Sequence, residues 1–176
     1  MALNKIVLIG YMGSGKSAVG RELATQLGWN LVDLDLEIQL NQGKNIPDIF
    51  KEKGEIYFRK IEAQLLRSVL SSSDNLVLSS GGGTPCYAGN MEALLADESV
   101  KTVYLKCSLA VLTERLWPER DARPLIAHLE SKEELNDFIR KHLFERSGFY
   151  LQSELLVNCD EKSPYKIASE IAVNLF

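Results

Sequence analysis

The stretch at residues 10–17, GYMGSGKS, carries side chains that can hold a chain of phosphates. It fits the pattern G-x-x-x-x-G-K-[ST], in which glycines let the backbone turn tightly and point N–H groups inward. Lys16 supplies a mobile positive charge for the terminal phosphates. The hydroxyl of Ser17 suits Mg²⁺, which takes few protein ligands. We therefore expect a nucleoside triphosphate with Mg²⁺ here, bound by Gly13, Ser14, Gly15, Lys16, Ser17 and Ala18.

The elements around this phosphate-binding loop are those that its chemistry requires. The apolar run 5–10 predicts a strand before the loop. After it, Val19, Leu23 and Leu27 recur at four-residue intervals, and Gly28 follows as a helix terminator. A helix that starts at the loop would direct the positive end of its dipole at the bound anion.

Further apolar runs alternate with helical patterns along the rest of the chain. The runs cover 31–36, 75–80, 100–107 and 154–159. Helical patterns cover 46–70 with a break at Gly54, 131–150 with a capping box at Ser131 and Glu134, and a last helix capped by Ser163. This order predicts an α/β fold of three layers, in which a five-stranded parallel sheet has helices on both faces. Ligands of such a fold bind outside the carboxyl ends of the strands.

Composition limits the class of protein. A chain of 176 residues with 45% hydrophobic residues is expected to form one domain over residues 1–176. A net charge of −4 makes nucleic acid or an anionic membrane an unsuitable partner, and no apolar run reaches membrane-spanning length. The three cysteines are interpreted as reduced thiols of a cytoplasmic protein. We expect a monomer.

The stretch 30–38, NLVDLDLEI, places two aspartates in an apolar run. In a strand over 31–36 successive side chains alternate, so we expect Leu34 and Leu36 to face the core while Asp33 and Asp35 share the opposite face. At the carboxyl end of a strand beside the phosphate-binding loop, that face is a candidate active site.

The phosphate-binding loop alone leaves two classes open. A GTPase-like switch would need N-K-x-D and D-x-x-G elements, and neither occurs in the sequence. A small-molecule kinase would need a second pocket. Arginines and the stretch SSGGGTP at 79–85 could build one, because a guanidinium binds a carboxylate at two points and glycines let the main chain approach a ligand closely. A regulatory nucleotide-binding protein stays the alternative.

The order of the motifs resembles the shikimate kinase family. The motifs are G-x-x-G-x-G-K-S, D-x-D at 33–35, F-R at 58–59, G-G-G at 81–83, R-P-L at 123–125 and R-x-x-x-Y at 146–150. The resemblance runs from Lys5 to about Tyr150. It implies an adenylate-kinase-like P-loop kinase fold and transfer of the γ-phosphate of ATP to the 3-hydroxyl of shikimate, on the pathway to chorismate and the aromatic amino acids. A kinase of another small hydroxy acid, such as gluconate, is the runner-up.

The resemblance also implies roles for single residues. It implies substrate contacts from Asp35, Arg59, Gly82 and Arg146, metal contacts from Ser17 and Asp33, and catalysis by Asp35, Lys16 and Arg123. Asp35 would lie beside the attacking oxygen. An aspartate near its ordinary pKa of about 3.9 is a weak proton acceptor at neutral pH, and Arg59 would lower that pKa further. We therefore expect Asp35 mainly to orient the hydroxyl.

Residues 115–126, RLWPERDARPLI, concentrate three arginines and two prolines between helical segments. This composition predicts a lid that closes over the nucleotide, excludes water and delivers an arginine to the transferring phosphate. The resemblance assigns Arg123 to the phosphates and Arg115 to the adenine side of ATP, whereas Arg120 has no assigned role. We interpret Glu62 as a surface charge. No pattern gives a partner to His128 or His142, which we interpret as surface or helix-face residues.

Overall fold

A computed structural model describes residues 3–176, and its centre is a parallel sheet. The strands are β1 (Lys5–Ile9), β2 (Asn30–Asp33), β3 (Leu76–Ser79), β4 (Val100–Lys106) and β5 (Leu155–Asn158). They form a five-stranded sheet in the order β2-β3-β1-β4-β5, with every neighbouring pair parallel. The predicted five-stranded parallel sheet is confirmed.

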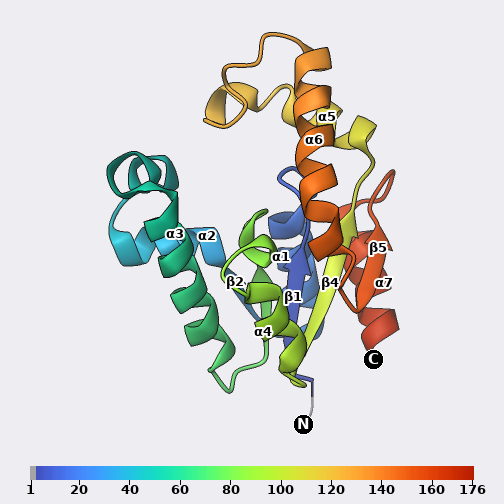
Figure 1. Ribbon diagram of the computed structural model, residues 1–176. Helices are drawn as coiled ribbons and strands as arrows, with labels where there is room; N and C mark the ends of the chain where they lie inside the picture. The colour runs from blue at the N-terminus through green and yellow to red at the C-terminus, as the bar shows by residue number, and fades with distance from the viewer. Residues whose placement is uncertain (1–2) are drawn as a thin grey trace.

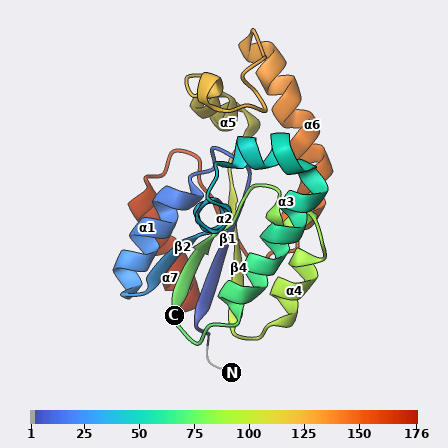
Figure 2. The same cartoon turned by 90° about the vertical axis from the view of Figure 1, so that its left-hand side faces the viewer.

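Helices cover both faces of this sheet (Figures 1 and 2). They are α1 (Lys16–Leu27), α2 (Leu34–Gln42), α3 (Ile46–Leu70), α4 (Asn90–Ala96), α5 (Leu109–Leu116), α6 (Lys132–Tyr150) and α7 (Pro164–Leu175), with short 3-10 turns η1 (Thr84–Cys86) and η2 (Arg120–Ala122). Figure 2 shows α1 and α7 on one side of the sheet and α3 and α4 on the other. The apolar residues of β1, β3 and β4 are buried between these layers, whereas Leu31 and Leu156 of the two edge strands are exposed. Across residues 3–176, no helix is long and apolar enough to cross a membrane.

Local sequence signals fix several helix boundaries. Gly28 ends α1 in the left-handed conformation at φ 66°. Ser131 and Ser163 accept hydrogen bonds from the third residues of α6 and α7. Gly54 has φ 80° and ψ 173° inside α3, so this segment is two helices joined at a kink. These four expectations are confirmed.

The strand expected over 31–36 is shorter than predicted. It ends at Asp33, whose side chain accepts hydrogen bonds from the backbone N–H groups of Asp35 and Leu36 and so starts α2. Leu34 is fully buried, but Leu36 is 52% exposed. The two aspartates therefore do not alternate along a strand: Asp33 caps a helix, and Asp35 lies in its first turn.

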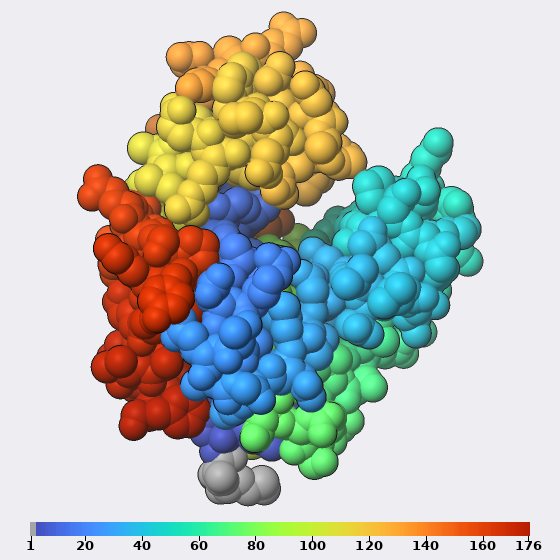
Figure 3. Space-filling view, turned by 180° about the vertical axis from the view of Figure 1, so that it is seen from behind, coloured from blue at the N-terminus to red at the C-terminus, as the bar shows by residue number. Residues whose placement is uncertain are grey.

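The connections place a crevice at the carboxyl end of β1. The chain leaves β1 toward β2 and β3 on one side and later returns to β4 on the other, which makes the end of β1 the topological switch point. The segment between α5 and α6 projects above this edge (Figure 1). In the space-filling view, the surface is hollowed between that segment, yellow to orange, and the start of α3, in cyan (Figure 3).

Candidate active site

The phosphate-binding loop leads directly into α1. Gly13 and Gly15 have φ values of +78° and +93°, which favour glycine. A Cβ on Gly13 would also lie 2.9 Å from the Leu116 side chain of α5. The Ser14 hydroxyl is buried without a hydrogen-bond partner in the described chain. A helix N-terminus with unused donors is suited to an anion.

Lys16 is held inside this loop. Its Nζ donates hydrogen bonds to the backbone carbonyls of Gly10, at 2.7 Å, and Tyr11, at 3.0 Å. Burial lowers the pKa of Lys16 to about 8, although the nearby carboxylates of Asp35 and Asp33 act to raise it. A buried ammonium that has only carbonyl partners is prepared to exchange them for phosphate oxygens.

Ser17 and Asp33 face each other at the end of β1 and β2. The Ser17 hydroxyl donates to Asp33 Oδ2 at 2.9 Å and lies 3.4 Å from the hydroxyl of Ser79. The other oxygen of Asp33 caps α2, so this carboxylate is oriented by the backbone. No cluster of three or more His, Cys, Asp or Glu side chains within residues 3–176 could hold a metal. A hydroxyl and one carboxylate next to a phosphate site nevertheless match the few protein ligands that Mg²⁺ takes.

Asp35 has a raised pKa, contrary to the expectation from its sequence neighbours. Burial is the largest cause and the charge of Asp33 the next, and together they raise the pKa of Asp35 to about 6. Lys16 and Arg59 lower it, but by less. The predicted lowering by Arg59 is therefore outweighed. At neutral pH the carboxylate is mostly ionised and is a better proton acceptor than an ordinary aspartate.

The glycine run at 81–83 brings three predicted substrate residues together. A Cβ on Gly81 would lie 2.9 Å from Asp35 Oδ1, one on Gly82 would lie 3.7 Å from Arg146 Nη1, and one on Gly83 would lie 2.8 Å from Arg59 Nη2. Each missing side chain thus leaves room for a different functional group. We call the backbone of residues 81–83 the glycine floor, because the carboxylate and the two guanidinium groups lie against it.

Arg59 is fixed by a carboxylate that sequence reasoning missed. Its Nη1 lies 2.8 Å from Glu62 Oε2, and the other oxygen of Glu62 accepts a 2.7 Å hydrogen bond from Thr84. Glu62 is 1% exposed, so the expectation of a surface charge is wrong. The Tyr87 ring covers the guanidinium at 4.0 Å. Arg59 is therefore fixed by Glu62 and Tyr87, with a weaker contact from Nε to Glu55 at 3.4 Å, and its Nη2 lies against Gly83.

Arg146 extends from α6 to the same floor. The next turn of the helix carries Tyr150, whose hydroxyl donates to the Gly82 carbonyl at 2.5 Å. Arg146 also lies over the ring of Tyr11, at 5.8 Å from its centroid. His142, one turn earlier on α6, is 3.1 Å from the Tyr11 hydroxyl, a partner that no sequence pattern indicated.

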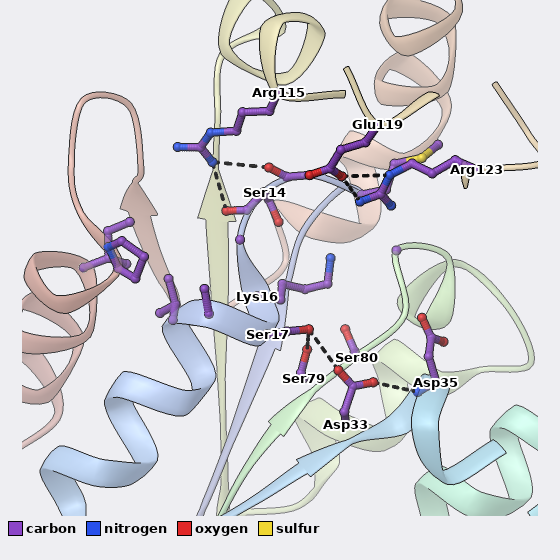
Figure 4. A pocket seen from close by; sticks show the side chains of 18 of the residues that line it. Ser14, Lys16, Ser17, Asp33, Asp35, Ser79, Ser80, Arg115, Glu119 and Arg123 are labelled. Atoms are coloured by element: carbon purple, nitrogen blue, oxygen red, sulfur yellow. Dashed lines mark hydrogen bonds and ion pairs between the residues drawn. The ribbon is translucent and has the colours of Figure 1, made fainter. Parts of the chain in front are cut away.

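A pocket of about 500 Å³ joins the phosphate-binding loop to the aspartates (Figure 4). All the residues predicted for ATP and metal line it, as do Asp35 and Gly82 of the predicted substrate set, whereas Arg59 and Arg146 lie beyond its boundary. Lining residues that sequence reasoning missed include Glu119, Lys162 and Ile167. Ser79 and Ser80, which belong to the stretch 79–85 that the sequence indicated without giving either serine a role, also line the pocket.

The predicted lid segment places its three arginines differently. Arg115 donates to the carbonyls of Gly13, at 3.2 Å, and Ser14, at 3.5 Å. Arg123 pairs with Glu119 at 2.6 Å on the rim of the pocket. Arg120 lies over the Trp117 ring at 4.1 Å, turned to a neighbour within its own segment. Figure 4 shows Arg123 above Lys16, across the pocket from Asp35.

A parallel α/β fold with a phosphate-binding loop at its switch point, and with Arg59 and Arg146 beside the neighbouring glycine run, is typical of P-loop kinases of small molecules. The family model described as shikimate kinase matches residues 12–175. A shikimate kinase of Flavobacterium psychrophilum is 41% identical over 99% of this chain and 100% of its own length.

Solved structures agree. The 1.7 Å crystal structure of shikimate kinase from Bacteroides thetaiotaomicron has a TM-score of 0.88 at 35% identity, with 99% of this chain and 97% of that chain covered. Shikimate kinase from Acinetobacter baumannii in complex with shikimate has a TM-score of 0.85 at 33% identity, with 97% and 91% covered. The chain belongs to the shikimate kinase family. It is an ATP-dependent kinase of shikimate, and neither a gluconate kinase nor a regulatory switch is favoured.

Proposed function

We propose that the 3-hydroxyl of shikimate accepts the γ-phosphate of ATP at Asp35. The observation that carries this proposal is the convergence of Asp35, Arg59 and Arg146 on the glycine floor, within reach of the phosphate-binding loop. Asp35 has a pKa of about 6, so it can orient the hydroxyl while ionised and accept its proton late in the transfer. A loose transition state needs little deprotonation of the nucleophile at an early stage.

The carboxylate of shikimate binds Arg59 and Arg146 in this proposal. Glu62 and Tyr87 hold the first guanidinium in place, and Tyr150 fixes the Gly82 carbonyl next to the second. Preorganised guanidinium groups lose little freedom on binding and give a carboxylate two-point geometry that lysine does not provide. The backbone of Gly82 then contacts the substrate ring.

ATP binds along the loop through Gly13, Ser14, Gly15, Lys16, Ser17 and Ala18, which line one pocket. Ser17 and Asp33 would hold Mg²⁺, Ser17 directly and Asp33 through water, which their 2.9 Å contact supports. When bound, Mg²⁺ supplies charge neutralisation for the phosphates. Lys16 exchanges its carbonyl partners for phosphate oxygens during binding.

The lid completes the nucleotide site. Arg115 contacts the loop backbone and serves the adenine side of ATP in this proposal. Arg123 leaves Glu119 and meets the transferring phosphate when the segment 115–126 closes. Closure of the lid excludes water from the bound ATP, which limits its hydrolysis.

The wider biology follows from the family and composition. We propose a single P-loop kinase domain over residues 1–176 that works as a cytoplasmic monomer on the route to chorismate, without nucleic acid or membrane partners. The net charge of −4 supports the absence of polyanion partners. The three cysteines are all free thiols in the structure, which supports a reducing compartment.

An acceptor panel tests the proposed reaction. ADP release is followed with shikimate, gluconate, nucleoside monophosphates or no acceptor, in each case with ATP and Mg²⁺. We expect release with shikimate alone. Equal release without an acceptor would indicate an NTPase, and release with gluconate would contradict the assigned acid pocket.

A further inference from the structure

Tyr11 connects the two halves of the active site. Its backbone carbonyl accepts a 3.0 Å hydrogen bond from Lys16, the cation of the phosphate-binding loop. Its side chain, 1% exposed, points the other way and packs under α6. There the hydroxyl meets His142 Nδ1 at 3.1 Å and the ring lies beneath the Arg146 guanidinium. One residue thus contacts the ATP side through its backbone and the acid-binding side through its ring.

His142 is fixed from two directions. Its ring lies 4.3 Å from that of Phe138 in a tilted arrangement and 6.2 Å from that of Tyr11 at 68°. The charged groups that act on His142 are Arg146 and Glu145, both of α6, and the phosphate-binding loop contributes only the Tyr11 hydroxyl. Burial and Arg146 lower the pKa of His142, so the ring is neutral at pH 7 and adds no cation beside the guanidinium.

We propose that Tyr11 and His142 are positioning residues that hold α6 against the phosphate-binding loop and so place Arg146 for the substrate carboxylate. The inference rests on the proposed role of Arg146. Arg146 has a long, rotatable side chain, and the ring and hydroxyl beneath it restrict where α6 presents the guanidinium. Loss of the Tyr11–His142 hydrogen bond loosens this placement without removing any group that touches the substrate.

Steady-state kinetics of four variants test the proposal. Tyr11→Phe and His142→Leu should each raise KM for shikimate about 3- to 10-fold, the range expected for one hydrogen bond, with kcat and KM for ATP changed less than about twofold. Because both variants break the same bond, the double variant should behave like either single variant. His142→Asn, which keeps a polar group near Nδ1, should recover most of the loss.

Two controls separate the possible failures. His128→Asn changes the other histidine, which contacts Phe138 and not Tyr11, and should leave KM for shikimate unchanged. Arg146→Lys should raise that KM. If Arg146→Lys has no effect, the proposed acid-binding role fails. If Arg146→Lys raises KM for shikimate while the folded variants Tyr11→Phe and His142→Leu do not, only this inference is overturned. The same conclusion follows if the effects of the two single variants add in the double variant.

A spectroscopic readout is independent of turnover. The chain has two histidines, so imidazole NMR signals of His142 can be followed with His128 as an internal reference. A carboxylate bound at Arg146 offsets the positive charge that lowers the pKa of His142, so adding shikimate should raise that pKa. An unchanged pKa of His142 at saturating shikimate would contradict the proposed binding of the shikimate carboxylate to Arg146 beside His142.

Discussion

Replacing Asp35 by asparagine should make the protein more stable while abolishing its activity. Burial and Asp33 raise the pKa of Asp35 from 3.8 to about 6, so the native state holds the proton about a hundredfold more tightly than the unfolded chain. Each factor of ten is worth about 1.4 kcal/mol, which puts the cost of the ionised carboxylate near 3 kcal/mol. Asp35 is half-buried and water screens part of this cost, so we expect a gain of about 2 kcal/mol at pH 7.

The sign of the pH dependence follows from linkage. Between pH 4 and 6 the native state binds more protons at Asp35 than the unfolded state does, so this residue makes the wild type less stable as pH rises. Above pH 6 both states are ionised and the cost is constant. The stability gap between Asp35→Asn and wild type should therefore open between pH 4 and 6 and then level off.

Urea denaturation from pH 4 to pH 8 measures this gap, and a coupled ADP-release assay measures turnover. Asp48→Asn is a matched control, since Asp48 also lies in the first turn of a helix but is exposed, and it should change stability by less than about 0.5 kcal/mol. Asp35→Asn should lose turnover about 100-fold or more and keep near-normal ATP affinity. The reasoning would be refuted if Asp35→Asn were less stable than wild type, or if the stability difference between the two did not change with pH. Substantial turnover by Asp35→Asn would also refute it.

Three further perturbations probe the same site. Gly81→Ala places a Cβ 2.9 Å from the Asp35 carboxylate and should lower kcat at least tenfold in steady-state assays; Gly148→Ala, with open space around its Cβ, should leave kcat unchanged. Glu62→Gln removes the buried charge that fixes the Arg59 guanidinium and should raise KM for shikimate at least fivefold; Glu55→Gln, which changes the exposed partner of the same guanidinium, should alter it less than twofold. The Lys16 pKa of about 8 predicts that ATP affinity, measured by calorimetry, is constant below pH 8 and falls above it by up to tenfold per pH unit.

Each of these three predictions has a result that would contradict it. Equal kcat values for the two alanine variants would contradict the glycine floor, and equal KM values for the two glutamine variants would contradict the buried ion pair. Constant ATP affinity from pH 7 to pH 10 would show that the phosphates do not depend on the ammonium form of the lysine.

The phosphate-binding loop was predictable because its function is encoded locally. Its glycines, Lys16 and Ser17 are consecutive, and the preceding strand and following helix have unambiguous periodicity. The sheet was predictable for the same reason, since each buried strand reads as a short apolar run. Order along the chain then sufficed to place the site at the strand ends.

The errors arose where a partner distant in sequence decides the outcome. An aspartate such as Asp33 can lie within a strand or cap a helix. Here its side chain accepts hydrogen bonds from the backbone N–H groups of Asp35 and Leu36, so it caps α2. Glu62 is buried with hydrogen-bond partners on both oxygens, Arg59 and Thr84, and Thr84 lies 22 residues later in the sequence. His142 meets Tyr11 across 131 residues. The raised pKa of Asp35 depends on burial, which spacing alone does not report.

The position of the phosphate on the product tests the central claim most directly. After reaction with ATP and Mg²⁺, the product of shikimate is analysed by phosphorus–proton NMR correlation. We predict a phosphorus signal coupled to the proton on carbon 3 alone, as required if Asp35 faces that hydroxyl while two arginines hold the carboxylate. A phosphate on another hydroxyl, or no phosphorylated shikimate, would contradict the account.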